Sequence, residues 1–275
     1  MSNLAVRVLV ALVGIPALVA IVLAGGWWLA GFVAISSGLG AGELYRMVQG
    51  KGIRPHTMLG IATATVIPLL VAAGYEHAVA PLVAALCILA MIGQLRRGTD
   101  GAISAIATTL LGAIYPAMLL ASIVALRQWQ ASSTTDGAWL VLLTMSGIWM
   151  CDTAAYFVGR RFGQCLLAPR ISPKKTWEGA IAGAFAGIAW CAVIAPLLLP
   201  WGSVWLGIGI GIVVGTVGQL GDLAESLLKR DAGIKDSSAI IPGHGGVLDR
   251  FDSLIATAPA VYGLLVILRW LALVP

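Results

Sequence analysis

Charged residues are scarce in this chain. Asp, Glu, Lys and Arg together make up 11% of its 275 residues, and the mean hydropathy is +0.95. A soluble domain carries about 25% charged residues, so this composition excludes a globule that is solvated by its own surface. The low charge predicts a protein that lies in a membrane.

Cysteine and the common catalytic motifs are also rare or missing. The four cysteines form no C-x-x-C pair and have no metal-ligand spacing, so we expect them to be small packing residues. No P-loop, G-x-S-x-G or H-E-x-x-H motif occurs, and no set of histidines and cysteines could hold zinc. These absences exclude the most easily recognised classes of nucleotide hydrolase, serine hydrolase and zinc protease.

Long apolar runs, by contrast, fill most of the chain. A helix needs about 20 mostly apolar residues to cross a hydrocarbon core of about 30 Å. The runs predict an all-α, polytopic integral membrane protein with about nine transmembrane helices. The predicted spans are Leu4–Leu23, Trp27–Tyr45, Thr57–Ala73, Ala78–Gly93, Ile103–Leu126, Ala138–Val158, Gly179–Leu199, Val204–Leu228 and Leu254–Leu273.

The distribution of Lys and Arg predicts the orientation of these spans. If the N-terminus is cytoplasmic, Arg127 and Arg269 are the only two of the 17 basic residues that fall on the outside. This bias follows the positive-inside rule, and the odd number of predicted spans then leaves the C-terminus outside. It also accounts for most of the net charge of +5 without a nucleic-acid partner. A basic cytoplasmic face suits anionic lipid headgroups or an anionic substrate.

Several carboxylates fall at one depth of the predicted spans, near the cytoplasmic surface. A charge within a spanning segment costs about 2.5–3.5 kcal/mol on insertion scales, so a single acid could be a helix-end residue that reaches the interface. A group of acids at one level instead predicts a water-accessible polar pocket that opens to the cytoplasm. The five acids are Glu43, Asp152, Glu178, Asp222 and Glu225.

The eighth predicted span shows how one helix could form a wall of such a pocket. Its polar residues follow the i, i+3, i+4 pattern and therefore lie on one face. Glycines recur at every fourth residue earlier in this span and also in the seventh span, which lets membrane helices approach closely. These glycines permit a homodimer but serve equally for packing within one chain. The polar residues are Gln219, Asp222, Glu225, Ser226 and Lys229; the glycines are Gly179, Gly183, Gly187, Gly207, Gly211 and Gly215.

Two long cytoplasmic loops are predicted, at residues 159–178 and 229–253. The first contains five basic residues, with Ser172 and Thr176 close to the start of the next span. Charge that only sets the topology, together with an ordinary Ser or Thr helix cap, would explain this pattern. A phosphate-binding cradle is the alternative, because helix N-termini and basic side chains both favour phosphate.

The second loop strengthens the case for phosphate chemistry. Asp249 and Asp252 repeat the i, i+3 spacing of Asp222 and Glu225, and Mg²⁺ often binds through one or two carboxylates together with substrate phosphates. Asp252 could instead cap the last span. Two acidic pairs with basic residues close by suit metal-assisted phosphoryl or nucleotidyl transfer. Glycines in this loop would let the backbone approach a ligand closely, and His244 could bind phosphate or brace the turn.

A long motif in this loop resembles the signature of the phosphatidate cytidylyltransferases, also called CDP-diacylglycerol synthases. The motif runs from Ser226 to Asp252, SLLKRDAGIKDSSAIIPGHGGVLDRFD. Three further segments resemble the same family: DTAAYFVGRRFG (152–163), SPKKTWEG (172–179) and GDLAES (221–226). The resemblance covers the C-terminal half, whereas the first 140 residues match only as a run of hydrophobic spans.

The resemblance implies a reaction between CTP and the membrane lipid phosphatidate that gives CDP-diacylglycerol and pyrophosphate and requires Mg²⁺. It leaves open whether one or two cations bind and whether dCTP replaces CTP. It implies catalytic roles for Asp222, Asp249, Lys229, Lys235, Arg250 and His244; substrate binding by Ser172, Lys174, Lys175, Thr176, Glu178, Asp152, Arg230, Gly245 and Gly246; and metal binding by Asp222, Asp249, Asp252 and Glu225.

The predicted spans and the position of the motifs also predict how the chain is organised. We expect residues 1–137 to form an N-terminal region of about five spans, and residues 138–275 to form a catalytic region of about four spans with both cytoplasmic loops. We expect the protein in a bacterial cytoplasmic (inner) membrane, with its active site facing the cytoplasm.

Two other functions also place acids in a membrane protein. A cation-coupled transporter would have acids near the midplane and inverted repeats, whereas here the acids lie toward one face and no repeat is visible. A transferase that consumes CDP-diacylglycerol would be expected to contain D-G-x-x-A-R followed by G-x-x-x-D-x-x-x-D, and that pattern is missing. The sequence therefore favours the cytidylyltransferase.

Overall fold

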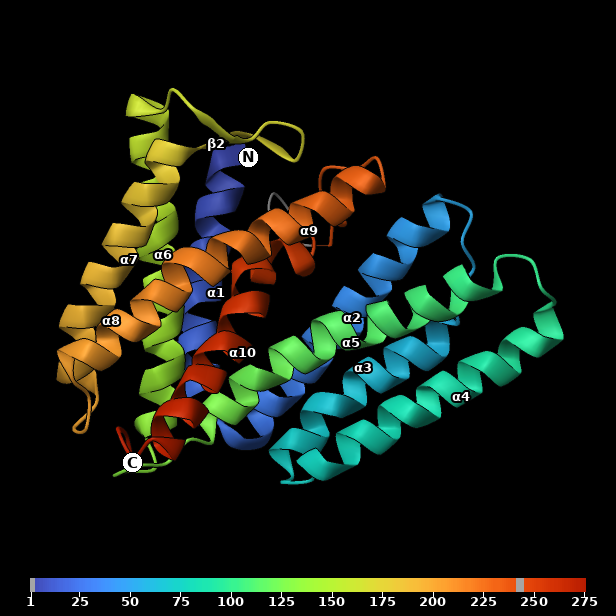
Figure 1. The fold of residues 1–275 in the computed structure, drawn as a ribbon, viewed down its shortest axis with the longest axis horizontal. Coiled ribbons are helices and arrows are strands. Elements are labelled where there is room, and N and C mark those ends of the chain that lie inside the picture. The colour runs from blue at the N-terminus through green and yellow to red at the C-terminus, as the bar shows by residue number, and fades with distance from the viewer. Residues whose placement is uncertain (1–2, 241–244) are drawn as a thin grey trace. The chain divides into compact units, whose positions relative to one another are not determined.

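Helices make up most of the chain in the computed structural model, which describes residues 3–240 and 245–275 (Figure 1). Each predicted span coincides with a helix, except that the eighth is divided into α8, a short π-helical segment η2, and α9. The elements are α1 (Asn3–Ala24), α2 (Gly26–Gly50), α3 (Thr57–Ala72), the 3₁₀ turn η1 (Glu76–Ala78), α4 (Val79–Arg97), α5 (Ala102–Arg127), α6 (Asp136–Phe162), β1 (Leu166–Ala168), β2 (Ser172–Thr176), α7 (Trp177–Leu198), α8 (Val204–Val213), η2 (Val214–Gly218), α9 (Gln219–Asp231) and α10 (Leu248–Trp270).

The described helices confirm an all-α membrane protein. Six segments within the described residues are long and apolar enough, by length and composition, to cross a membrane. The helix α3 and the apolar stretch Leu12–Ala24 of α1 are shorter. The count of nine spans and the orientation of the two termini therefore stay predictions. The six segments are Glu76–Arg97, Ala102–Arg127, Asp136–Phe162, Trp177–Leu198, Val204–Asp231 and Leu248–Trp270.

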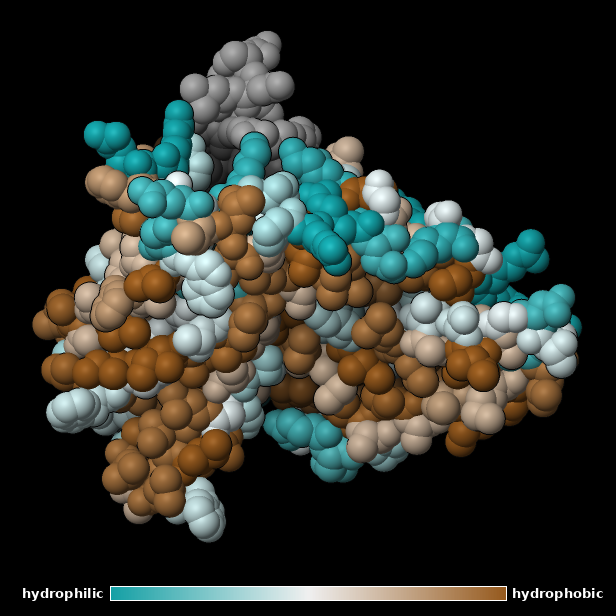
Figure 2. Space-filling view, turned by 45° about the horizontal axis from the view of Figure 1, so that its top comes forward, coloured by the Kyte–Doolittle hydropathy of each residue, from teal (hydrophilic) through white to brown (hydrophobic). Residues whose placement is uncertain are grey.

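The surface is as apolar as a membrane protein requires. Hydrophobic residues, brown in Figure 2, cover much of the face that the view shows. Large side chains such as Trp28, Leu95 and Ile103 are 78%, 83% and 85% exposed. Apolar exposure on this scale is rare in soluble monomers, and it is expected where helices face lipid.

The described chain divides into two compact units, and the first comprises residues 1–125 and 229–251. Tyr45 of α2 lies at the centre of its core, fully buried, and donates its hydroxyl hydrogen bond to the carbonyl oxygen of Thr109 at 2.7 Å. Gly60 and Gly112 leave room for its ring, because a Cβ at these positions would lie 1.7 and 2.2 Å from ring or hydroxyl atoms of Tyr45. The unit thus packs α2, α3 and α5 around one large aromatic side chain.

The second unit comprises residues 126–228 and 252–275, and its helices α6, α7 and α8 pack through glycine. A Cβ at Gly183 would lie 2.8 Å from the carbonyl oxygen of Cys151. A Cβ at Gly207 would lie 2.2 Å from the carbonyl oxygen of Cys191, and one at Gly211 would lie 2.4 Å from the Cα of Ile188. These contacts confirm the predicted close packing. Because they lie inside one chain, they lend no support to a homodimer.

A short β-hairpin between α6 and α7 is absent from the sequence-based prediction. Strands β1 and β2 pair antiparallel, with Leu166 opposite Thr176 and Ala168 opposite Ser172. Strands this short carry too few residues for an alternating pattern to be visible. Thr176 then caps α7, and its hydroxyl oxygen accepts the Gly179 N–H at 3.2 Å, as expected for a Thr at this position.

The start of α10 differs from the prediction. The apolar run begins at Leu254, but the helix begins at Leu248, so Asp252 lies inside the helix. The alternative that Asp252 only caps the last span is therefore wrong. The polar first turn is helical because its N–H groups find acceptors elsewhere in the fold, and those acceptors belong to the site described next.

Candidate active site

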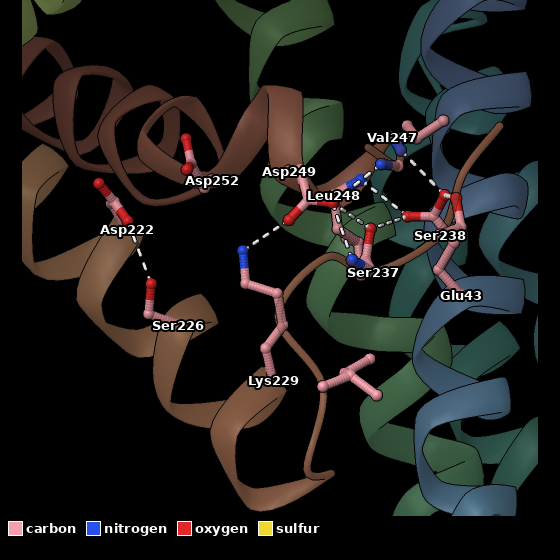
Figure 3. A network of polar contacts seen from close by, with 12 residues as sticks. Glu43, Asp222, Ser226, Lys229, Ser237, Ser238, Val247, Leu248, Asp249 and Asp252 are labelled. Atoms are coloured by element: carbon pink, nitrogen blue, oxygen red, sulfur yellow. Dashed lines mark hydrogen bonds and ion pairs between the residues drawn. The ribbon is translucent and has the colours of Figure 1, made fainter. Parts of the chain in front are cut away.

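The predicted site residues fall in both units, and each unit gathers its own group. In the first unit, the centre of the group is an ion pair between Lys229 in α9 and Asp249 in the first turn of α10 (Figure 3). The Lys229 Nζ lies 2.6 Å from the Asp249 Oδ1, and both side chains are buried. Burying two charges is costly unless they are paired and their remaining hydrogen bonds are made.

The second carboxylate oxygen of Asp249 has its own donors. Its Oδ2 accepts the Ser237 N–H and the Gly246 N–H, both at 2.8 Å. Gly245 has a φ of +83°, in the left-handed region that favours glycine, and a Cβ there would lie 2.6 Å from the Asp249 Oδ2. The close approach that these glycines allow is thus to side chains of the chain itself.

The other predicted phosphate-binding residues of this unit lie at the surface. Arg230, Lys235 and Arg250 are exposed, and an Nη atom of Arg230 donates to the carbonyl oxygen of Ile234 at 2.9 Å. Exposed basic side chains of this kind are accessible to an anionic ligand. The prediction for His244 lies outside the described residues.

In the second unit, α6, β1, β2, α7 and α9 line an open cavity of about 630 Å³. It brings together five of the predicted site residues. The Lys175 Nζ lies 2.5 Å from the Asp222 Oδ2, and both side chains remain about a quarter exposed. Tyr156, Arg160 and Gln219 also line the cavity. The five predicted site residues that line the cavity are Asp152, Lys174, Lys175, Thr176 and Asp222.

The remaining predicted residues of this unit lie elsewhere. Neither Ser172 nor Glu178 is among the described residues that line the cavity. The Glu178 carboxylate instead accepts the Cys165 N–H at 3.1 Å and so braces the start of the hairpin. Glu225 is fully buried, and Asp252 is half-buried, with its Oδ1 accepting the Ser253 N–H at 2.6 Å.

The donor set for a metal ion is partial. Among the described residues, no three His, Cys, Asp or Glu side chains come together to hold a metal ion. Asp152 and Asp222 both line the cavity of the second unit, and this pair fits Mg²⁺, which commonly binds one or two carboxylates and completes its shell with substrate phosphate and water. Asp249 fits less well, because Lys229, Ser237 and Gly246 already donate to its oxygens.

The hydrogen bonds between Glu43 and the two serines of the loop emerge only from the structure. The expectation that Glu43 lies in a water-accessible pocket is wrong, because its side chain is fully buried and accepts hydrogen bonds from Ser237, Ser238, Val247 and Leu248 (Figure 3). The adjacent serines in KDSS were the available signal, since paired hydroxyls inside a charged motif suggest hydrogen bonding to a carboxylate.

Comparison with known proteins extends the match beyond the motif. The sequence matches the model of the cytidylyltransferase family over residues 5–268. It is 35% identical over 293 aligned positions to a phosphatidate cytidylyltransferase of Synechocystis sp., covering 95% of this chain and 96% of that protein. It is also 35% identical to the chloroplastic phosphatidate cytidylyltransferase 5 of Arabidopsis thaliana, over 88% of this chain and 67% of that protein. A Brucella suis phosphatidate cytidylyltransferase is 47% identical over 44% of this chain and 45% of its own length. Since the family model and the first relative both span nearly the whole chain, the chain belongs to the cytidylyltransferase family.

Proposed function

We propose that this chain transfers the cytidylyl group of CTP to phosphatidate, giving CDP-diacylglycerol and pyrophosphate. The observation that carries the proposal is the cavity of the second unit, which gathers Asp152, Lys174, Lys175 and Asp222. Acidic and basic side chains in one cavity are what a bound metal–triphosphate complex requires. The family relatives that match nearly the whole chain carry the same activity in their names.

The reaction needs little covalent chemistry from the protein. A phosphate oxygen of phosphatidate forms a bond to the α-phosphorus of CTP. The bond from that phosphorus to the oxygen that bridges the α- and β-phosphates breaks, and pyrophosphate leaves with the bonding electrons. The attacking phosphate is already anionic, so no side chain has to remove a proton from it. Catalysis then consists of positioning the two substrates and neutralising the triphosphate charge.

The basic residues of the cavity would neutralise that charge. Lys174 and Lys175 lie on β2 directly before the N-terminus of α7, where the helix dipole also favours a phosphate group. Arg160 lies at the end of α6 and lines the same cavity. Arg230, Lys235, Arg250 and His244 stay as proposed phosphate-binding residues, and Ser172 stays as a proposed substrate-binding residue.

A bound Mg²⁺ would supply charge stabilisation at the triphosphate. We propose Asp152 and Asp222 as its carboxylate ligands, and Asp249, Asp252 and Glu225 stay as proposed metal-binding residues. The proposed location is a bacterial cytoplasmic (inner) membrane with the cavity open to the cytoplasm. That side supplies CTP, and the adjoining lipid supplies phosphatidate.

Variants of the purified protein in detergent test the proposal. We expect the wild type to form CDP-diacylglycerol from CTP and phosphatidate, and to lose this activity when Mg²⁺ is removed with a chelator. Asp222→Asn should lower kcat by at least about 100-fold, because the cavity loses one of its two proposed carboxylate ligands for Mg²⁺. Asp100→Asn, which removes an exposed acid of the α4–α5 connection, is the matched control and should stay at wild-type activity. A folded Asp222→Asn variant with wild-type turnover would contradict the assignment of the cavity.

A further inference from the structure

Glu43 is an acidic residue that the proposed reaction does not use. It lies in α2, almost 200 positions before the motif in the sequence, and none of its side chain is exposed. A buried carboxylate is costly unless donors surround it, so its partners indicate what it stabilises.

All four described donors to Glu43 belong to one short part of the chain: the described residues of the α9–α10 loop (232–240 and 245–247) and the first residue of α10. The Oε1 accepts the Val247 N–H at 2.9 Å and the Ser238 hydroxyl at 2.6 Å. The Oε2 accepts the Leu248 N–H at 2.9 Å and the Ser237 hydroxyl at 2.8 Å (Figure 3). Each oxygen thus takes one backbone donor and one hydroxyl.

The backbone donors identify Glu43 as a cap for α10. The N–H groups at the start of a helix have no acceptor within the helix, and the helix dipole favours a negative charge there. Glu43 supplies both an acceptor and a charge, and it does so from a different helix. The fit is close, because a Cβ at Gly246 would lie 2.5 Å from its Oε1.

Ser237 connects this cap to the ion pair of the first unit. Its Oγ lies 2.8 Å from the Glu43 Oε2 and 2.9 Å from the Asp249 Oδ2. The hydroxyl has one proton and can donate to only one of the two carboxylates at a time. The position of Asp249, and with it Lys229, therefore depends on the segment that Glu43 holds.

We propose that Glu43 is a positioning residue for the reaction: it fixes the α9–α10 loop and the start of α10 so that Asp249 and Lys229 keep their places. The role of Glu43 in turnover rests on the proposed function. Its stabilisation of the loop can be measured by hydrogen exchange, which does not require an active enzyme.

Glu43→Gln is the sharpest test, because it keeps the shape and changes one acceptor into a donor. Val247 and Leu248 donate to different oxygens, so an amide leaves one of these N–H groups without an acceptor. We expect kcat to fall by at least about tenfold, since small misplacements of reacting groups cost that much or more. Hydrogen exchange should become faster in peptides that contain residues 245–250.

Asp136→Asn is the matched control. Asp136 is also a fully buried acid at a helix N-terminus, and it accepts N–H groups of residues 131–133 before α6. The variant should lower thermal stability and leave the kcat of the folded enzyme unchanged. An equal loss of kcat in Asp136→Asn and Glu43→Gln would show that Glu43→Gln acts only by destabilising the protein. That result would overturn the proposal.

The outcomes separate this proposal from the proposed function. If the wild type forms no CDP-diacylglycerol, the proposed function fails. Hydrogen exchange still tests whether Glu43 holds the α9–α10 loop in place. If the wild type is active and Glu43→Gln keeps its kcat, the positioning role is wrong.

If Glu43→Gln fails to fold, Ser238→Ala is the second variant to test, because it removes one of the four donors to Glu43. It should fold and lower kcat by about threefold or more, because one of the four hydrogen bonds that position the segment is removed. Wild-type kcat in that variant would overturn the proposal.

Discussion

Lys229 and Asp249 form a buried ion pair whose side chains are 9% and 6% exposed. Their charges are compensated by each other and by the N–H groups of Ser237 and Gly246. Such a pair contributes little net stability compared with an apolar pair, but removing one partner leaves a buried charge unpaired. The residues are thus coupled both in stability and in the geometry they hold.

Lys229→Met tests this coupling. We expect the variant to lose about 3–5 kcal/mol of unfolding free energy, because the Asp249 carboxylate stays buried without its cation. The double variant Lys229→Met with Asp249→Asn should be more stable than the single one, although both should lack activity. Denaturant unfolding in detergent, followed by circular dichroism, measures both. A single variant as stable as the wild type would show that the pair is open to water.

At the scale of whole elements, the contact between α7 and α8 leaves no room for a side chain at Gly211. A Cβ at Gly211 would lie 2.4 Å from the Ile188 Cα, which is backbone and cannot rotate away. Small residues let membrane helices approach to this distance, and packing across the short gap then stabilises the pair. The wall of the cavity in the second unit depends on the same helices, because α7 carries Gly179 and Ala180, which line it.

Gly211→Leu should therefore separate α7 from α8. We expect a loss of at least about 1–3 kcal/mol of stability, typical of overpacking, together with reduced yield of folded protein. Gly209→Ala is the control on the same helix, because a Cβ there would lie 3.3 Å from the end of the Leu264 side chain, which can move. Thermal unfolding of the two variants in the same detergent makes the comparison. Equal stability of both would contradict the close helix contact.

At the scale of the whole molecule, much of the helical architecture was predictable because apolar runs of the necessary length have few other stable states in a membrane. The start of α10 was not, since Glu43 stabilises its first turn from a helix far away in the sequence. The basic and acidic residues of the cavity could be predicted from the family motifs. The burial of Glu225 could not, because the helical periodicity places it on the same face as Asp222 and says nothing of what covers it.

The most direct test of cytidylyl transfer to phosphatidate is to determine which phosphate bond of CTP breaks. The purified protein would be incubated with phosphatidate and Mg²⁺, and with CTP that carries radioactive phosphorus at either the α- or the γ-position. The account predicts that the α-label enters the lipid as CDP-diacylglycerol, while the γ-label is released as pyrophosphate in equal amount. A γ-label that enters the lipid, or an α-label that stays in solution while phosphatidate is consumed, would contradict cytidylyl transfer by this chain.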